Sequence, residues 1–197
     1  MMAVERTQLL LVRHGKTAWN REGKLQGTID IPLEEDSKEE IAKLAEILRG
    51  RNIRSIYTSP LKRAVETARI IQVEIRVDQL FADNNLRERN VGSFQGKSVS
   101  DLPAPYNKIG LDLFFAQAPI DDGEPIQEFN ERTLATIKRI AQKHQGESVL
   151  VVTHGGNIRT ILDSVNQSLI TLPDVISNST VFVLEVAEER IRLIGVI

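Results

Sequence analysis

The sequence has no cysteine, and this absence excludes a disulfide framework, a thiol nucleophile and a thiolate metal site. It also has no long hydrophobic run, because apolar stretches such as Leu9–Val12 and Val149–Val152 are far too short to cross a bilayer. Neither sign of charge dominates: 25 lysines and arginines stand against 27 aspartates and glutamates, a net charge of −2. Such a chain has no overall field to attract nucleic acid or an anionic membrane, so we expect neither as a partner.

The length and composition are those of an ordinary globular protein. At 197 residues the chain is about 1.3 times a typical domain, which predicts a single domain over residues 1–197. Hydrophobic residues at 41% and charged residues at 26% exclude wholesale disorder. The polar segment Met1–Gln8 is unlike a secretory signal, so we expect a soluble, cytoplasmic protein. Nothing in the sequence indicates the oligomeric state.

Short apolar strands alternate with amphipathic helices, a pattern typical of an α/β fold with a mostly parallel sheet. Apolar runs predict strands over residues 9–12, 55–58 and 148–153, and a strand pair over 180–186 and 190–197. Helical spacing of apolar residues predicts helices within residues 37–48, 59–68, 126–140 and 158–165. We therefore expect a three-layer α/β sandwich, with a mostly parallel sheet and helices on both of its faces.

Two of these helices begin with capping signals. Ser37 and Glu40 form a capping-box pair, which predicts the start of the first helix. Ser59 is expected to cap the second helix, with Pro60 at its first position. Arg63 lies in the early turns of that helix and off its apolar stripe, so we expect it to face away from the core.

Residues 86–125 interrupt the alternation of strands and helices. The segment holds Pro103, Pro105, Pro119 and Pro125 among the chain's seven prolines, and no long helical or alternating pattern survives in it. Connections of this length are usually functional or disordered, so we expect an irregular lid that covers a site.

Two buried strands end in the same way, with a histidine followed by a glycine. His14-Gly15 follows the first apolar run, and His154-Gly155 follows the run at residues 148–153. Ligands of open parallel sheets bind beyond the carboxyl ends of the strands, so the two imidazoles predict one shared site. His144 lies near the end of a predicted helix instead, and we expect it to be structural.

Basic residues accompany these histidines. Arg13 precedes His14, and Arg63 follows a predicted helix start, so two guanidiniums, two imidazoles and a helix N-terminus could surround a phosphoryl group. Neither a G-x-x-x-x-G-K-[ST] loop nor a G-x-G-x-x-G loop is present. No H-E-x-x-H or comparable ligand pair is present either, so we expect no metal site.

Five stretches together resemble the histidine phosphatase superfamily, in its phosphoglycerate mutase-like branch. In chain order they are Arg13-His14-Gly15 with Asn20, Gln26–Leu33, Thr58–Ala68, Leu86-Arg87-Glu88 with Gly92 and Gly96, and Val152–Gly156. A lone R-H-G sequence would be weak evidence, whereas five elements in order are specific. The resemblance implies a phosphoglycerate mutase-like sheet.

The resemblance also implies a role for each matching residue. His14 would be the nucleophile that forms a phosphohistidine, with its second nitrogen held by a backbone carbonyl. Arg13, Arg63 and His154 would hold the phosphoryl oxygens. Glu88 would protonate the leaving oxygen and then activate water, which requires a raised pKa.

The remaining implied contacts are with substrate. The expected substrate-binding residues are Thr17, Asn20, Gln26, Gly27 and Gly155. Weaker candidates for the acid are Glu22, Asp83 and Glu124. No cofactor is expected.

These expectations favour a metal-independent phosphomonoesterase that acts on small, soluble phosphate esters. Residues 90–131 hold only Lys97 and Lys108 as bases against seven acids, and such a lid is poorly suited to grip a second anionic group. The alternatives are a phosphoglycerate mutase, which returns the phosphoryl group to substrate, and a catalytically silent phosphate-binding protein.

Overall fold

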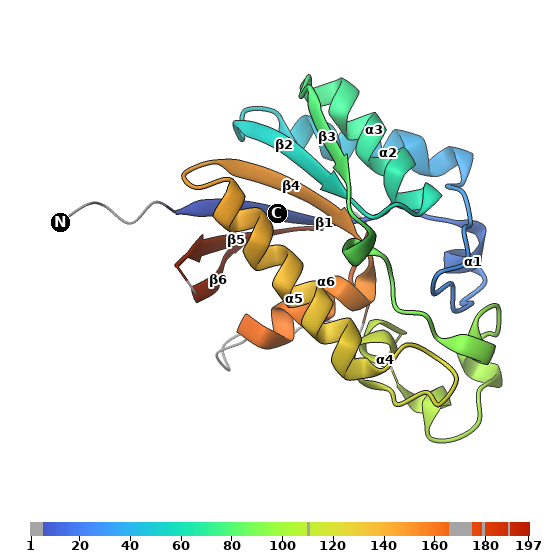
Figure 1. The fold of residues 1–197 in the computed structure, drawn as a ribbon. Helices are drawn as coiled ribbons and strands as arrows, with labels where there is room; N and C mark the ends of the chain where they lie inside the picture. The colour runs from blue at the N-terminus through green and yellow to red at the C-terminus, as the bar shows by residue number, and fades with distance from the viewer. Residues whose placement is uncertain (1–5, 110, 166–174, 179, 189) are drawn as a thin grey trace.

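The structure is a computed structural model that describes residues 6–109, 111–165, 175–178, 180–188 and 190–197. Its centre is a six-stranded sheet in the order β3-β2-β4-β1-β5-β6 (Figure 1). The strands are β1 (Thr7–Arg13), β2 (Ile53–Thr58), β3 (Gln79–Ala82), β4 (Ser148–Thr153), β5 (Val181–Ala187) and β6 (Arg190–Val196). The pairs among β3, β2, β4 and β1 are parallel, and β5 and β6 add antiparallel strands at one edge.

Helices cover both faces of this sheet, which confirms the predicted architecture (Figure 1). They are α1 (Ala18–Arg21), α2 (Glu35–Leu48), α3 (Lys62–Ile75), α4 (Leu111–Gln117), α5 (Ile126–Lys143) and α6 (Gly155–Val165). One core lies between the sheet and α2 and α3, and the other between the sheet and α5 and α6. No helix among the described residues combines the length and hydropathy needed to span a membrane.

The central strands are apolar throughout because each contributes to both cores. On β1, Leu9 and Leu11 pack in the core beneath α5 and α6, while Leu10 and Val12 pack in the core beneath α2 and α3. Successive side chains of a strand point to opposite faces, so a strand buried on both sides needs an unbroken apolar run. This is why the strands predicted from such runs are confirmed within a few residues.

The elements that the sequence did not reveal are short. β3 spans four residues and its side chains are half-buried or exposed, so no unbroken apolar run in the sequence predicts it. α4 spans seven residues inside the segment 86–125, which also contains 3₁₀ turns at Gly92–Phe94, Val99–Asp101 and Tyr106–Lys108. Phe114 and Phe115 of α4 form a third small core with other residues of this segment and with Leu25 from the loop after α1.

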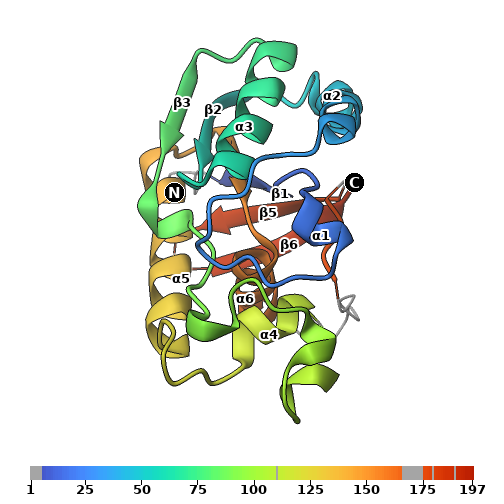
Figure 2. The ribbon, with the colours of Figure 1, turned by 90° about the vertical axis from the view of Figure 1, so that its right-hand side faces the viewer.

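This segment lies beyond the carboxyl ends of the strands. Figure 2 looks onto that edge and shows α1, the stretch after residue 86 and α4 in front of the sheet. An isolated antiparallel bridge between Lys24 and Ser98 joins the stretch to the loop after α1. The segment is therefore placed where ligands of parallel sheets bind.

Both predicted helix starts are wrong in detail. α2 begins at Glu35, and Ser37 lies inside its first turn, where its Oγ accepts a hydrogen bond from the Lys16 N–H at 2.7 Å. Glu40 pairs with the Lys16 ammonium at 2.7 Å rather than closing a capping box. α3 begins at Lys62 after the cap residue Leu61, because the Ser59 side chain is engaged at the sheet edge. Ser37 thus holds a neighbouring loop, and Ser59 joins His154 to the N–H of Leu61, the cap residue of α3.

The contact between Ser37 and the loop after β1 can be tested by stability. We expect Ser37→Ala to lower the free energy of unfolding by about 1–2 kcal/mol, because it leaves the Lys16 N–H without its acceptor. The exposed pair of Glu40 with Lys16 is worth less, so Glu40→Gln should change stability by less than about 0.5 kcal/mol. Urea denaturation measures the stability of both variants. Equal losses of stability in the two would support a capping box between Ser37 and Glu40.

Candidate active site

His14 follows β1 directly and is 3% exposed. Its Nδ1 lies 2.7 Å from the carbonyl oxygen of Gly15, which can only accept, so Nδ1 carries the proton and Nε2 is unprotonated. Burial, reinforced by Arg63 and Arg13, holds the pKa of His14 well below its usual value. The ring is therefore neutral at physiological pH, as a nitrogen nucleophile must be.

Arg63 on α3 is the cation nearest to this nucleophile. Its Nε donates to His14 Nε2 at 3.3 Å, and its two terminal nitrogens donate to the carbonyls of Ile29 at 2.8 Å and Gly27 at 2.7 Å. Burial lowers its pKa to about 10, so the guanidinium keeps its charge at neutral pH. Arg63 lies outside the apolar clusters on both faces of the sheet, so it faces away from the core as expected, but it is 1% exposed because it is buried at the sheet edge.

His154 follows β4 and lies beside His14, with 5.1 Å between the ring centroids. Its Nε2 lies 2.7 Å from Ser59 Oγ, which also accepts from the Leu61 N–H at 3.3 Å. Its Nδ1 is buried without a hydrogen-bond partner among the described residues. Burial and then Arg63 hold the pKa of His154 well below its usual value, so this ring is neutral as well.

Glu88 brings a carboxyl group to the same place and is 4% exposed. One oxygen accepts from the Arg89 N–H at 2.9 Å and the other from the Gly156 N–H at 3.1 Å, at the start of α6. Burial raises the pKa of Glu88 to about 7, Asp112 adds to the rise, and the two N–H groups oppose it. A carboxyl group that titrates near neutral pH can both donate and accept a proton.

Arg13 is anchored by a residue that the sequence analysis missed. Its Nη1 donates to the Ile176 carbonyl at 2.6 Å and pairs with Asp112 of α4 at 3.3 Å. Asp112 is 1% exposed, accepts also from the Ile176 N–H, and burial raises its pKa. It lies so close to Gly155 that a Cβ there would overlap its carboxylate. No motif marks Asp112, because its partners come from distant parts of the chain.

The structure brings the five predicted catalytic residues together, and all are at most 5% exposed: Arg13, His14, Arg63, Glu88 and His154. The predicted substrate-binding residues surround them with other partners. Thr17 caps α1 and its amide donates to Asn20 Oδ1 at 3.1 Å. Gln26 is 6% exposed, and its Oε1 has no hydrogen-bond partner among the described residues. Contact of substrate with Thr17, Asn20, Gln26, Gly27 or Gly155 stays a prediction.

The weaker candidates for the acid are each held in an ion pair. Glu22 pairs with Lys24 at 2.6 Å, Asp83 with Arg139, and Glu124 with Arg132 at 2.5 Å. Glu88 differs from these candidates, because its carboxyl group accepts from two backbone N–H groups and burial raises its pKa to about 7. His144 is structural, as predicted, because its ring bonds to the Tyr57 hydroxyl at 3.0 Å and to Glu147 at 2.8 Å.

The cluster combines the groups that phosphoryl transfer requires. His14 offers an unprotonated nitrogen, and Arg63 places positive charge within hydrogen-bond distance of it. Glu88 is within electrostatic reach of Arg63 and can supply a proton near pH 7. Preorganised charge around a transferred phosphoryl group is the main source of catalysis in such reactions.

The raised pKa of Glu88 predicts a pH-dependent stability. The folded protein keeps this proton at pH values where the unfolded chain has lost it, so stability is full below about pH 4.5 and falls as the pH rises to about 7. The Glu88→Gln variant lacks this titration, so its free energy of unfolding relative to that of the native protein should rise by up to about 3 kcal/mol from pH 5 to pH 8. Urea denaturation at both pH values measures this, with the exposed Glu46→Gln as control; equal behaviour of the two variants would contradict it.

Most of the chain matches known proteins. The sequence model of the histidine phosphatase superfamily (branch 1) matches residues 9–196. The chain is 35% identical over 173 residues to a metal-independent phosphoserine phosphatase of Arabidopsis thaliana, covering 83% of this chain and 71% of that protein. It is 33% identical over 181 residues to phosphoglycerate mutase-like protein 4 of the same plant, covering 89% and 78% respectively.

A solved structure shows the same fold. A phosphoglycerate mutase from Bacillus anthracis superposes with a TM-score of 0.81 at 28% identity, over 98% of this chain and 93% of that one. Relatives of this kind are phosphatases or mutases that act on phosphate esters. The resemblance expected from the five motifs is thereby confirmed, and the chain belongs to the histidine phosphatase superfamily.

Proposed function

We propose that the protein is a metal-independent phosphomonoesterase that hydrolyses small, soluble phosphate esters through a phosphohistidine on His14. The observation that carries this proposal is the state of the His14 ring. Its Nδ1 keeps the proton and donates it in a hydrogen bond to the Gly15 carbonyl, and its unprotonated Nε2 accepts from the Arg63 guanidinium. A neutral nitrogen aimed at a fixed cation is arranged to attack a phosphorus atom whose oxygens that cation binds.

In the first step, His14 Nε2 attacks phosphorus and the ester P–O bond breaks. The leaving oxygen takes the proton of Glu88, while Arg63, Arg13 and His154 stabilise the charge on the transferred group. In the second step, the Glu88 carboxylate takes a proton from water, the water oxygen attacks phosphorus, and the P–N bond breaks. Phosphate leaves, His14 is again neutral and Glu88 is again protonated.

Water as the acceptor is favoured over a second substrate by two observations. The relative at 35% identity is named a phosphatase. Residues 90–131 carry seven acids and two bases, which disfavours binding of a second anionic group. Asp112 and Glu124 of that count are paired with Arg13 and Arg132, so the remaining excess is smaller than the sequence suggests. A phosphoglycerate mutase is the second candidate, supported by the names of other relatives.

We propose further that residues 86–125 cover the substrate within a single domain over residues 1–197. Two observations support this role. The segment lies beyond the carboxyl ends of the strands, and it carries both Glu88 and Asp112 into the site. It also has its own small core around Phe114, so it can keep its shape when substrate enters.

Replacement of the nucleophile tests the proposed function directly. We expect His14→Asn to slow phosphate release from a panel of phosphomonoesters, in the presence of a chelator, by at least about a thousandfold. His144→Asn is the control, because His144 lies away from the site and its folded fraction should keep the native rate. Native rates in His14→Asn would overturn the mechanism. Isomerisation of 3-phosphoglycerate that outpaces hydrolysis would favour the mutase.

The pH dependence tests the role of Glu88. Protonated Glu88 and neutral His14 are both required in the first step, so kcat/KM should fall about tenfold per pH unit above a pKa of about 7. Above that pH the phosphate ester is already a dianion, since its second pKa is about 6. Because the pKa of His14 is well below its usual value, the ring stays neutral and nucleophilic as the pH falls below 7.

The Glu88→Gln variant separates this explanation from others. It should lose the fall above pH 7 together with most of the rate, because an amide cannot deliver the proton. Rates of phosphate release between pH 5 and pH 9 measure both effects. An unchanged alkaline fall in Glu88→Gln would assign the titration to another group.

A further inference from the structure

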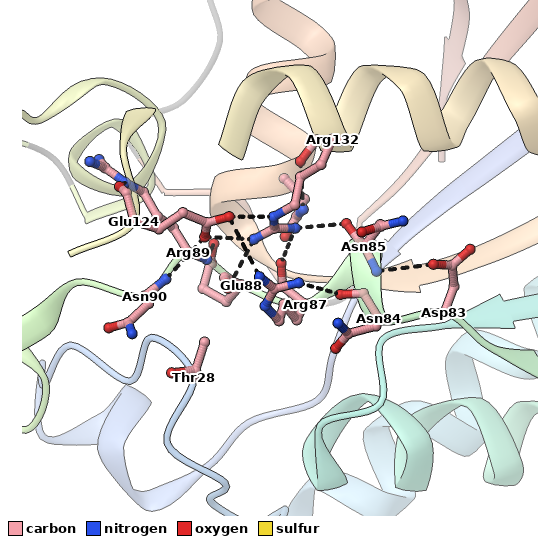
Figure 3. Close-up of polar contacts among 12 residues, drawn as sticks. Thr28, Asp83, Asn84, Asn85, Arg87, Glu88, Arg89, Asn90, Glu124 and Arg132 are labelled. Atoms are coloured by element: carbon pink, nitrogen blue, oxygen red, sulfur yellow. Dashed lines mark hydrogen bonds and ion pairs between the residues drawn. The ribbon is translucent and has the colours of Figure 1, made fainter. Parts of the chain in front are cut away.

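The loop that carries Glu88 is held from behind by one guanidinium, that of Arg132 on α5 (Figure 3). Arg132 Nη1 donates to the carbonyls of Asn85 at 2.7 Å and Arg87 at 2.9 Å. Its Nη2 donates to the carbonyl of Glu88 itself at 3.3 Å. The Arg132 side chain therefore donates to three backbone carbonyls within a stretch of four residues.

Glu124 completes the set of partners. Its two carboxylate oxygens accept from Arg132 Nε at 2.5 Å and from Nη2 at 2.9 Å. A guanidinium has five N–H donors in a fixed plane, and Arg132 makes five hydrogen bonds with these partners. Its side chain is 12% exposed, so these bonds are largely protected from water. Because the guanidinium is planar and all its donors are engaged, it fixes the three backbone carbonyls relative to one another.

The chain after Glu88 is fixed by the same assembly. Glu124 also accepts from the Asn90 N–H at 3.3 Å, and its backbone carbonyl accepts from Arg89 Nε at 2.7 Å. Arg89 Nη1 in turn donates to the Ala118 carbonyl at 2.6 Å, just beyond α4. The Glu88 backbone is thus held to α5 on one side and to the end of α4 on the other.

We propose that Arg132 is a positioning residue, which aims the Glu88 carboxyl at the leaving-group oxygen by fixing the backbone of residues 85–88. This inference rests on the proposed role of Glu88 as the general acid. Arg132 itself bonds to carbonyls and to Glu124, and leaves Glu88 to transfer the proton. A misplacement of about 1 Å at a reacting group can cost about a hundredfold in rate, so a loosened loop would be visible in the kinetics.

The readout is the dependence of the rate on the leaving group. An alkyl phosphate releases a basic alkoxide that needs the proton of Glu88, whereas p-nitrophenyl phosphate releases a stable phenolate that needs it little. We expect Arg132→Lys, which has three donors on one atom, to lower kcat/KM for the alkyl ester by about 10- to 100-fold. For p-nitrophenyl phosphate the loss should be under about threefold.

Arg139→Lys is the matched control. Arg139 comes from the same helix and pairs with the side chain of Asp83, just before the Glu88 loop, but it is 51% exposed. We expect this variant to keep the native rates with both esters. Glu124→Gln is the milder second variant, which keeps the size of the side chain but loses its charge, and it should show the same selective loss to a smaller degree.

A double variant separates positioning from general stability. If Arg132 acts through Glu88, adding Arg132→Lys to Glu88→Gln should cause no further selective loss for the alkyl ester. Equal losses with both esters, or losses that multiply in the double variant, would overturn the inference. Thermal denaturation of each variant shows the folded fraction to which the rates are normalised.

The proposed function can fail separately from this inference. If the native protein releases phosphate from neither ester, or if His14→Asn keeps its rate, the phosphohistidine mechanism fails. If His14→Asn is inactive and Arg132→Lys shows no leaving-group selectivity, the mechanism stands and the positioning role fails.

Discussion

The parallel pairing of β1 with β4 is the constraint on which the rest of the site depends. The strands run in register, with Arg13 opposite Thr153, so the residues that follow them leave the sheet at the same level. That alignment places the rings of His14 and His154 with 5.1 Å between their centroids. A slip of one residue would move each apolar side chain of a strand into the opposite core, where its neighbours are packed around other side chains, so the two cores protect the register.

Burial then sets the chemical state of each group at this edge. The two imidazoles are held neutral and the pKa of the Glu88 carboxyl group is raised to about 7, because the charged forms are costly away from water. Arg63 cannot lose its charge so easily, and it is stabilised instead by the carbonyls of Gly27 and Ile29. The low dielectric environment that imposes these costs also strengthens the interaction of the cluster with a transferred phosphoryl group.

The fold and the five central residues could be predicted because each has a local signal. Unbroken apolar runs mark β1 and β4. Short motifs mark the five central residues, which are Arg13, His14, Arg63, Glu88 and His154. Asp112, Arg89 and Arg132 have no such signal, since most of their acceptors and partners are backbone groups that only the folded chain brings together. The capping box at Ser37 failed for the same reason, because a tertiary contact with Lys16 displaced a local one.

The two glycines at the start of α6 show how this arrangement limits the thermal optimisation of the protein. Glycine in a helix costs about 1 kcal/mol relative to alanine, so replacement by alanine is a standard route to a hardier enzyme. At Gly156 an added Cβ would lie 2.5 Å from the Glu88 carboxylate, and at Gly155 it would overlap that of Asp112. Alanine at either position would collide with a buried acid, so this route to heat resistance is closed at the start of α6. The first turn of α6 thus lacks two side chains because the carboxylates of Asp112 and Glu88 occupy the room that those side chains would fill.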